Sequence, residues 1–433
     1  MRFLRDIIGL MRTPAGRSKF LSAWNYASFP LMWPVGALYR RLVLRRTRIV
    51  AVVGSLGKTT TLASVAAALR VPHRARDNAN SWSEVVWCLL RVRPAATRAA
   101  LEVGIAKPGQ MRWYAWMLRP QVTVVTSIAS DHNRSLPTLE VTRMEKAAMV
   151  RALGREGLAV LNGDDSNVLW MRGQTHARVI TFGFGPENDV RAEDWQIDWP
   201  HGARFTVRIG TRSWLVRSRL FGRHMVYPFL AALAVADAEG ADMDAAVAAF
   251  ASMEPVYGRM ELFHLPGGAW ILADDYKASQ ESLFTALEAF GEMPAPRRLA
   301  VLGEVNEPVG SQHKLYREVG RQAGRHAARI ILCGGGKLKN ARTGAIRAGV
   351  KPENVTISST MTVLEIAALL EKELRPGDLL LVKGRTDQRL RRVVLKLQGR
   401  PVRCTIPLCH LNGLDCDHCP MLERGWEGIR AVT

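Results

Sequence analysis

The sequence predicts an α/β protein with two domains, each built around a mostly parallel sheet. From Ile49 onward, short β-branched runs alternate with alanine-rich stretches, as strands alternate with helices in such domains. The alternation is interrupted near Gly258 and starts again at Trp270. A chain of 433 residues is long enough for two or three domains with sizeable cores. We therefore expect a larger first domain, a smaller Rossmann-like second domain and a short Cys-rich tail.

The segment before the first predicted strand has an unusual composition. Residues 1–19 are basic with apolar residues at helical spacing, residues 20–39 are uncharged and aromatic, and arginine pairs follow. Twenty uncharged residues could span a bilayer, but we expect Pro30 and Pro34 to break the helix, and no convincing signal-peptide cleavage site follows. Aromatic residues flanked by arginines favour an interfacial segment on an anionic cytoplasmic membrane surface. The alternative is a helical hairpin packed on the protein itself or on a partner chain.

A glycine-rich loop follows the first predicted strand. Residues 54–61 read Gly-Ser-Leu-Gly-Lys-Thr-Thr-Thr, between the apolar run 49–53 and a helical stretch at 62–69. Glycines let backbone N–H groups converge on an anion, and the helix N-terminus adds a partial positive charge. Lys58 would reach the outer phosphates of a nucleoside triphosphate, and the Thr59 hydroxyl would bind Mg²⁺. The predicted cradle comprises Gly54, Ser55, Gly57, Lys58, Thr59 and Thr60, with two residues between its glycines where the common P-loop has four.

The remaining elements follow in order. In the first domain, buried apolar runs predict strands at 122–126 and 158–161, the alternation in 195–218 predicts a hairpin, and helices are expected at 227–238 and 242–250. In the second domain, strands are expected at 270–273, 299–302, 330–333 and 379–382, with helices at 282–290 and 315–326. We place the domains at 49–256 and 257–400, between an N-terminal segment (1–48) and a tail (401–433).

The charge and the cysteines limit the partners and the compartment. The net charge of +21 favours acidic partners such as nucleotides, phosphorylated substrates or anionic lipid surfaces. No nucleic-acid recognition module is present, so we expect no nucleic-acid partner. Isolated cysteines beside a predicted ATP site indicate the reducing cytoplasm, with the inner membrane face as a further expected location.

Four cysteines lie close together in the tail. Cys404, Cys409, Cys416 and Cys419 have the spacing C-x4-C-x6-C-x2-C. Four thiolates in such a short segment can close a tetrahedral Zn²⁺ site, so we predict a structural zinc that holds a tail too short to fold alone. An iron–sulfur cluster, disulfides and free thiols are the alternatives.

Several separate motifs, in the same order, resemble those of the Mur ligase superfamily, the ATP-dependent amide-forming ligases of peptidoglycan assembly and their relatives. The resemblance covers residues 49–395 and is strongest to the MurF type, which adds a D-Ala-D-Ala dipeptide. The short phosphate loop is typical of this family. The other motifs are Asp77-Asn-Ala-Asn-Ser81, Leu101-Glu-Val-Gly104, Ser127 to His132, Glu145-Lys-Ala147, Leu161-Asn-Gly-Asp-Asp165, Gly222-Arg-His224, Gly258-Arg-Met-Glu261, Asp274 to Ser279, Val301-Leu-Gly-Glu304 and Val382-Lys-Gly384.

The resemblance implies a role for particular residues. Thr59 and Glu102 would hold Mg²⁺ between the β- and γ-phosphates, with Asn80 in the nucleotide site, while His132 and Lys146 would serve a second Mg²⁺. In several family members the lysine at the Lys146 position is carbamylated. In the second domain, Arg259 and Lys277 would reach the γ-phosphate on domain closure, and Asp274 or Asp275 would bind the ribose or order the loop. Residues 224–228 lack both asparagines of the family's His-Asn-x-x-Asn segment, which leaves adenine recognition open.

The resemblance implies an ATP- and Mg²⁺-dependent ligase that joins a carboxylate to an amine through an acyl phosphate. Peptidoglycan-precursor ligases carry a UDP-binding domain before the P-loop, where this chain has only its basic, aromatic segment. We therefore expect an envelope or polymer precursor as substrate. The alternatives are a MurT-like synthetase that takes ammonia from a glutaminase partner, a CapB-like poly-γ-glutamate synthase and a non-catalytic membrane-bound scaffold. Folylpolyglutamate synthase also lacks that domain. The expected partners are the carboxylate, the amine, a membrane surface, and a second copy or a glutaminase.

Overall fold

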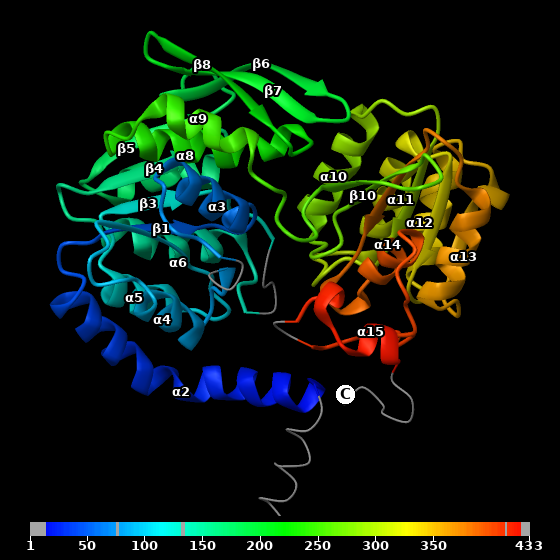
Figure 1. Ribbon diagram of the computed structural model, residues 1–433, viewed down its shortest axis with the longest axis horizontal. Coiled ribbons are helices and arrows are strands. Elements are labelled where there is room, and N and C mark those ends of the chain that lie inside the picture. Colours follow the sequence, from blue (N-terminus) through cyan, green and yellow to red (C-terminus); the bar gives the residue numbers. More distant parts are fainter. Residues whose placement is uncertain (1–13, 75–77, 131–134, 412–413, 426–433) are drawn as a thin grey trace, which may run out of the picture. The chain divides into compact units, whose positions relative to one another are not determined.

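The computed structural model describes residues 14–74, 78–130, 135–411 and 414–425. The chain forms two compact units, each with its own sheet (Figure 1). Residues 25–255 form the first, which we call the central unit. The described residues from 256 to 425, together with residues 14–24, form the second, which we call the C-terminal unit. The α/β class and the mostly parallel sheets predicted from the sequence are confirmed.

The central unit contains an eight-stranded sheet with the order β2-β1-β3-β4-β5-β6-β7-β8. Neighbouring strands are parallel from β2 to β6 and antiparallel from β6 to β8. The predicted hairpin is therefore part of a three-stranded antiparallel extension. The strands are β1 (Arg48–Val53), β2 (Arg98–Glu102), β3 (Val122–Val125), β4 (Leu158–Asn162), β5 (Arg178–Gly183), β6 (Val190–Asp198), β7 (Gly202–Ile209) and β8 (Arg212–Ser218).

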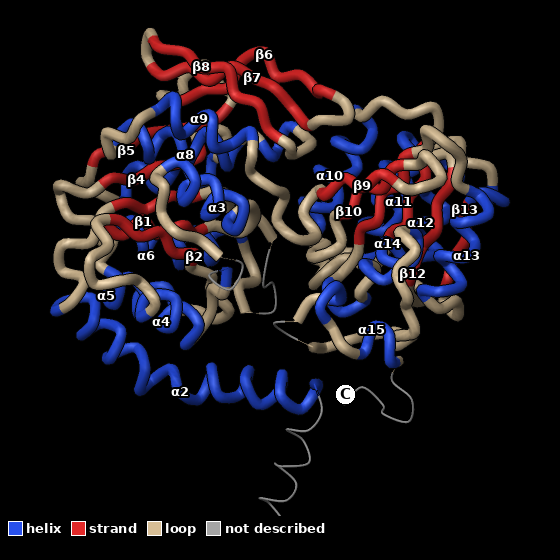
Figure 2. Tube along the Cα trace, in the orientation of Figure 1, coloured by secondary structure: helices blue, strands red, loops and turns tan. Residues whose placement is uncertain are grey.

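Helices cover both faces of this sheet (Figure 2). Alternate residues of β1 enter two different cores, because successive strand side chains point to opposite faces. Ile49 and Val53 join a core with α4, α5 and α6, whereas Val50 and Val52 join a core with α3, α8 and α9. The helices are α3 (Lys58–Ala68), α4 (Ser83–Leu90), α5 (Gln110–Leu118), α6 (Leu139–Arg151), α7 (Ser166–Leu169), α8 (Tyr227–Ala238) and α9 (Met243–Ala251), with 3₁₀ turns η2 (Trp170–Gln174) and η3 (Arg223–Met225).

The helix α2 runs without interruption from Pro14 to Leu42, so the prediction that Pro30 and Pro34 break it is wrong. Both prolines lie on the exposed side, while Phe29 and Ala37 are buried in the core of the central unit. This packing outweighs the backbone hydrogen bonds that the prolines remove. Among the described residues, no helix is long and apolar enough to cross a membrane.

The C-terminal unit has a six-stranded sheet with the order β13-β12-β11-β14-β10-β9, parallel except for β9 at one edge. The strands are β9 (Glu261–His264), β10 (Trp270–Ala273), β11 (Arg298–Leu302), β12 (Arg329–Cys333), β13 (Val355–Ser358) and β14 (Leu379–Lys383). The helices are α10 (Gln280–Glu292), α11 (Gln312–His326), α12 (Leu338–Arg347), α13 (Val363–Glu373), α14 (Arg391–Leu397) and α15 (Met421–Arg424), with 3₁₀ turns η4 (Pro352–Asn354), η5 (Thr386–Gln388) and η6 (Cys416–His418).

Candidate functional site

The phosphate loop lies between β1 and α3, as the sequence predicts. Two glycines allow its path. Gly57 has a φ of 79°, in the left-handed region. At Gly54 a Cβ atom would lie 1.9 Å from Oγ1 of Thr126. Lys58 is the first residue of α3, and its Nζ lies 3.2 Å from the carbonyl oxygen of Ser55. The N-terminus of α3 thus opens directly from the loop, as a phosphate cradle requires.

The segment after β3 fixes the shape of this loop. The Ser55 N–H donates to the carbonyl of Ser127 at 2.8 Å, and the Leu56 N–H donates to Oγ of Ser127 at 3.0 Å. Thr126 Oγ1 donates to the carbonyl of Leu56 at 2.6 Å. From β4, Asn162 Nδ2 donates to the carbonyl of Thr126 at 2.9 Å. The segment after β3 therefore holds the loop directly, and β4 supports that segment.

Lys146 reaches the same loop from α6. Its side chain is buried, and Nζ donates a hydrogen bond of 2.9 Å to Oγ of Ser55. That hydroxyl also bonds the backbone N–H and the carbonyl oxygen of Ala129, at 2.9 and 3.0 Å. A buried cation beside the cradle lowers the cost of collecting negative charge there. Carbamylation of Lys146 stays a prediction.

Glu102 ends β2, next to β1 in the sheet, and is 2% exposed. Asn80 Nδ2 donates to its Oε1 at 2.5 Å. Its other oxygen, Oε2, is buried without a hydrogen-bond partner among the described residues. A buried carboxylate oxygen without a partner destabilises the fold unless a cation or a hydrogen-bond donor binds it. This oxygen fits a Mg²⁺ ligand, since Mg²⁺ prefers carboxylate oxygen and the family implies such an ion here.

The Asn-Gly-Asp-Asp turn after β4 has a structural role. Asp165 caps α7 by accepting from the N–H groups of Asn167 and Val168, and it also accepts from the N–H of Ile128 at 2.8 Å. Asp164 accepts from the Tyr227 hydroxyl at 2.9 Å and from the Phe184 N–H at 2.6 Å. The turn thus connects β4 with the segment after β3, with β5 and with the start of α8. Tyr227 lies within the segment where the family's asparagines are missing.

In the C-terminal unit, Asp274 pairs with a buried lysine, Lys383, for which the sequence predicted no role. Lys383 at the end of β14 is 1% exposed, and its Nζ lies 2.6 Å from Oδ2 of Asp274. The same Nζ donates to the carbonyl of Lys277 at 2.9 Å. Burial lowers the pKa of Lys383, and the neighbouring Asp274 opposes this effect. These contacts order the loop after β10, one of the two roles predicted for Asp274.

Asp275 lies beside an arginine of α14. Nη1 of Arg391 is 3.7 Å from Oδ1 of Asp275 and 2.7 Å from Oε2 of Glu261. Burial raises the pKa of Asp275 to about 7, although the positive charge of Arg391 favours the ionised carboxylate. Arg259 lies over the ring of the adjacent Tyr276, with its Cζ 5.1 Å from the ring centroid.

The structure brings the predicted residues together in two sets. Ser55, Lys58, Glu102 and Lys146 belong to the central unit with Gly54, Gly57, Thr59, Thr60 and Asn80, whereas Arg259, Asp274, Asp275 and Lys277 belong to the C-terminal unit. His132 lies outside the described residues. Sequence reasoning assigned no role to Ser127, Lys383 or Arg391. Ser127 and Lys383 could have been found, because each lies within one of the family motifs. Arg391 lies in an ordinary basic run that gives no such signal.

The part of the tail that the structure describes does not show the predicted zinc site. No group of three or more His, Cys, Asp or Glu side chains within the described ranges is arranged to hold a metal ion, and the four cysteines are free thiols. Nη1 of Arg392 lies 3.4 Å from Sγ of Cys404, and the Cys409 N–H donates to the carbonyl of Asp387. Burial raises the pKa of Cys416 to about 12. Contacts of individual residues hold the tail on the C-terminal unit.

Comparison with known proteins agrees with this geometry. The profile of the Mur ligase middle domain matches residues 52–236, and that of the Mur ligase, glutamate ligase domain matches residues 258–386. The UDP-N-acetylmuramoyl-tripeptide--D-alanyl-D-alanine ligase of Mycobacterium bovis is 30% identical to this chain, over 80% of this chain and 72% of that protein. The chain belongs to the Mur ligase family. The ligase of the same name from Escherichia coli is 28% identical, over 81% of this chain and 77% of that protein.

Solved structures show the same fold. MurF from Acinetobacter baumannii superimposes with a TM-score of 0.74 at 20% identity, over 85% of this chain and 80% of that chain. MurF from Thermotoga maritima, in complex with ADP, gives a TM-score of 0.74 at 20% identity, over 86% and 84%. This Mur ligase family member is therefore an ATP-dependent enzyme of the C–N ligase type.

Proposed function

We propose that this protein uses ATP and Mg²⁺ to activate a carboxylate as an acyl phosphate and then joins it to the amine of an amino acid or a short peptide. A cell-envelope precursor supplies the carboxylate. The observation that carries the proposal is Glu102 Oε2, a buried carboxylate oxygen without a hydrogen-bond partner among the described residues. It ends the strand that pairs with β1, the strand that leads into the phosphate loop.

The residues of the central unit would bind and orient the triphosphate. The N-terminus of α3 and Lys58 bind the phosphates, and Lys146, through Ser55, holds the loop. Thr59 and Glu102 would hold the Mg²⁺, which neutralises charge that develops between the β- and γ-phosphates. Because Ser127 fixes the loop, a bound triphosphate would meet a preformed cradle.

Two transfers complete the reaction. A carboxylate oxygen attacks the γ-phosphorus, and the bond to the β–γ bridging oxygen breaks, which releases ADP. The amine nitrogen then attacks the acyl carbon, the C–O bond to phosphate breaks, and the nitrogen loses a proton as the amide forms. Arg259 and Lys277 would stabilise the transferred phosphoryl group when the substrates are bound.

The names of the relatives favour peptide addition over the alternatives. Both ligases compared above are named for adding D-alanyl-D-alanine to a UDP-linked tripeptide. Neither name describes an amidating synthetase or a poly-γ-glutamate synthase. We therefore propose a peptide or amino acid as the amine, with ammonia as an outcome that the experiment must be able to detect.

Phosphate release from ATP tests the proposal. The purified chain is incubated with ATP, Mg²⁺ and an acidic envelope-precursor peptide, and D-alanyl-D-alanine, single amino acids or ammonium are added separately. We expect release that requires both the acid and a peptide or amino acid, is lost in Lys58→Ala, and persists in the exposed-lysine control Lys314→Ala. Stimulation by ammonium alone would replace peptide addition by amidation. Release insensitive to Lys58→Ala would refute the ligase mechanism.

A further inference from the structure

The outward face of α2 is apolar along its whole length within the central unit. From residue 27 to residue 38, every exposed position carries an apolar side chain. Leu31 is 77% exposed, and Val35, Leu38 and Leu42 continue the same face at spacings of four, three and four residues. These exposed apolar positions are Ala27, Pro30, Leu31, Pro34, Val35 and Leu38.

The opposite face of α2 packs against the rest of the central unit. Phe29 and Ala37 are buried in the core shared with α4 and α5, and a Cβ at Gly36 would lie 2.9 Å from Met117 and Val86 side-chain atoms. Ser28 Oγ hydrogen-bonds Ser83 Oγ at 2.9 Å. A surface helix normally presents polar residues on the side away from its core. The apolar outward face is therefore not needed to pack α2 on the protein.

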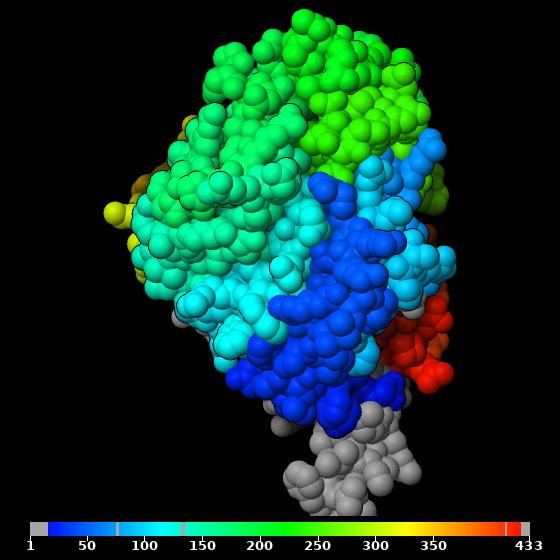
Figure 3. Space-filling model, turned by 90° about the vertical axis from the view of Figure 1, so that its left-hand side faces the viewer, coloured from blue at the N-terminus to red at the C-terminus, as the bar shows by residue number. Residues whose placement is uncertain are grey.

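Aromatic and basic side chains border this face. Trp113 and Trp116 of α5 are each half exposed, and both lie against Trp33 of α2. The guanidinium of Arg41 lies 4.0 Å from the ring centroid of Trp116. Residues 25–46 and 106–120 contain no Asp or Glu but seven basic residues, Arg40, Arg41, Arg45, Arg46, Lys107, Arg112 and Arg119. Figure 3 shows the blue atoms of α2 on the surface of the central unit.

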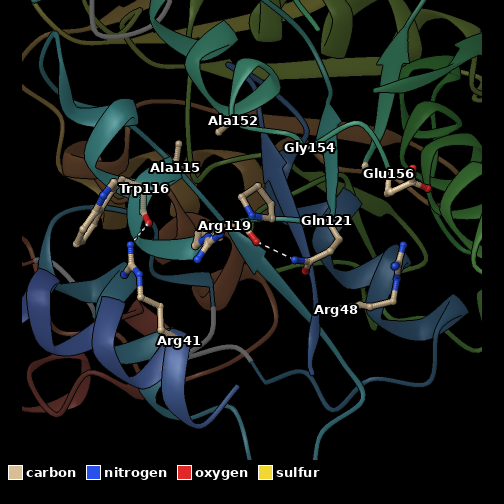
Figure 4. Close-up of a pocket in the computed structure, with 11 residues that line it drawn as sticks. Arg41, Arg48, Ala115, Trp116, Arg119, Gln121, Ala152, Gly154 and Glu156 are labelled. Atoms are coloured by element: carbon tan, nitrogen blue, oxygen red, sulfur yellow. Dashed lines mark hydrogen bonds between the residues drawn. The ribbon is translucent and has the colours of Figure 1, made fainter. Parts of the chain in front are cut away.

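A cavity of about 600 Å³ adjoins this region (Figure 4). Arg41, Trp116 and Arg119 line it, together with Arg48 and Glu156. Arg48 pairs with Glu239 at 2.6 Å, so the remaining charges of the lining are those of Arg41, Arg119 and Glu156, which leave one excess positive charge. Guanidinium groups recognise phosphate oxygens, so the cavity offers a place for an anionic headgroup.

We propose that the surface formed by α2 and α5 docks on an anionic lipid membrane, with the apolar face of α2 in the interface and lipid phosphates against the bordering arginines. An apolar face with aromatic and basic residues at its border is typical of a helix that lies in the membrane interface. The charge complements anionic lipid. A second copy of the chain is a poorer occupant, because a symmetric interface would bring these cations against each other.

Vesicle co-sedimentation of the full chain tests the docking. The vesicles are pure phosphatidylcholine or a mixture of phosphatidylcholine and phosphatidylglycerol. We expect binding to the anionic vesicles that is at least about tenfold stronger than to the neutral ones and that weakens with salt. The double variant Leu31→Glu/Leu38→Glu should lose binding to both kinds of vesicle by about tenfold or more. Arg45→Glu/Arg46→Glu should lose binding mainly to the anionic ones.

Two controls make the test decisive. Leu215→Glu changes a leucine on β8 that is also about half exposed, so vesicle binding and phosphate release should match those of the unchanged chain. Phosphate release should also persist in the α2 variants, which shows that they fold. Unchanged vesicle binding by Leu31→Glu/Leu38→Glu would overturn the proposal, because another segment would then carry the binding. A concentration-dependent dimer that this variant abolishes, without vesicle binding by the unchanged chain, would assign the face to a second copy.

Discussion

Lys146 and Ser55 are 91 residues apart in the sequence, yet Nζ of the lysine donates a 2.9 Å hydrogen bond to the hydroxyl of the serine. The contact joins α6 to the phosphate loop. It places a buried positive charge at the site where the proposed reaction gathers negative charge.

Replacing Lys146 by Met should lower kcat by about 100-fold or more, because it removes a fixed buried cation from a site of developing charge. The measurement is steady-state phosphate release with saturating substrates. Arg151→Met on the same helix is the matched control, since Arg151 is exposed and contacts Met144 and Gln174. Restoration of Lys146→Ala by added formate would instead show that a carboxylate is needed at this position, as a carbamylated lysine would provide.

Replacing Ser55 by Ala should have a smaller effect than replacing Lys146. The variant loses the hydroxyl that joins Lys146 to Ala129, but it keeps the positive charge of Lys146 and the hydrogen bond from the N–H of residue 55 to the carbonyl of Ser127. We expect a several-fold fall in kcat and a loss of about 1–3 kcal/mol in unfolding free energy. Urea unfolding and phosphate release on the same samples measure both. Equal losses in kcat for the two variants would show that Lys146 acts only through Ser55.

The variant Glu102→Gln should weaken Mg²⁺ binding without lowering the stability of the metal-free protein. Glutamine keeps an oxygen for the Asn80 amide but removes a buried charge whose Oε2 has no hydrogen-bond partner in the described structure. Without Mg²⁺ the thermal midpoint should therefore stay level or rise. The extra stabilisation that Mg²⁺ and ADP give together should fall sharply. Thermal unfolding with and without each ligand measures this, and full Mg²⁺-dependent stabilisation of the variant would contradict the assignment.

Asp275 should make the stability of the protein depend on pH. Its pKa is raised from 3.8 to about 7 by burial, so the fold favours the protonated carboxyl. This contribution is complete below about pH 4 and is lost as the pH rises through about 7. The asparagine of Asp275→Asn cannot ionise, so this variant escapes the loss. The thermal midpoint of the variant minus that of the unchanged chain should therefore rise by several degrees between pH 4 and pH 8. The exposed control Glu353→Gln should follow the unchanged chain, and parallel curves for Asp275→Asn would exclude this titration.

The pair of Lys383 and Asp274 should show the cost of breaking a buried ion pair. Lys383→Met leaves the Asp274 carboxylate without its 2.6 Å partner, and we expect a loss of about 3–5 kcal/mol in unfolding free energy. Asp274→Asn combined with Lys383→Met should recover much of that loss, because no uncompensated charge remains. Urea unfolding of the two single variants and the double variant measures the coupling energy. Additive losses would show that the two side chains act independently.

The sequence could predict elements whose signals are local. β1, the phosphate loop and α3 follow one another within a few residues, so the strand pattern, the glycines and the helical stretch all fall inside one short window. Helix α8 was predicted from its run of apolar residues with the bounds that the structure shows. For the candidate site, the motifs named residues but not their contacts.

The remaining features depend on residues distant in the sequence. Pro30 and Pro34 argue locally against a helix, and only the packing of Phe29 and Ala37 on α4 and α5 reverses that preference. In the sequence, Lys383 is simply the last residue of an apolar strand. Its partner Asp274 lies 109 residues earlier in the chain, and only the fold brings the two side chains together. The cysteine spacing fits a metal site, but spacing does not state where each thiol points.

The hydrogen bonds that Ser127 and Thr126 make to the phosphate loop have a consequence for how tightly a nucleotide can bind. These hydrogen bonds come from the protein itself, so they restrict the loop independently of the nucleotide and leave little conformational entropy to be lost when phosphate binds. The free energy of the new phosphate contacts can then appear as affinity instead of offsetting the ordering of a mobile segment.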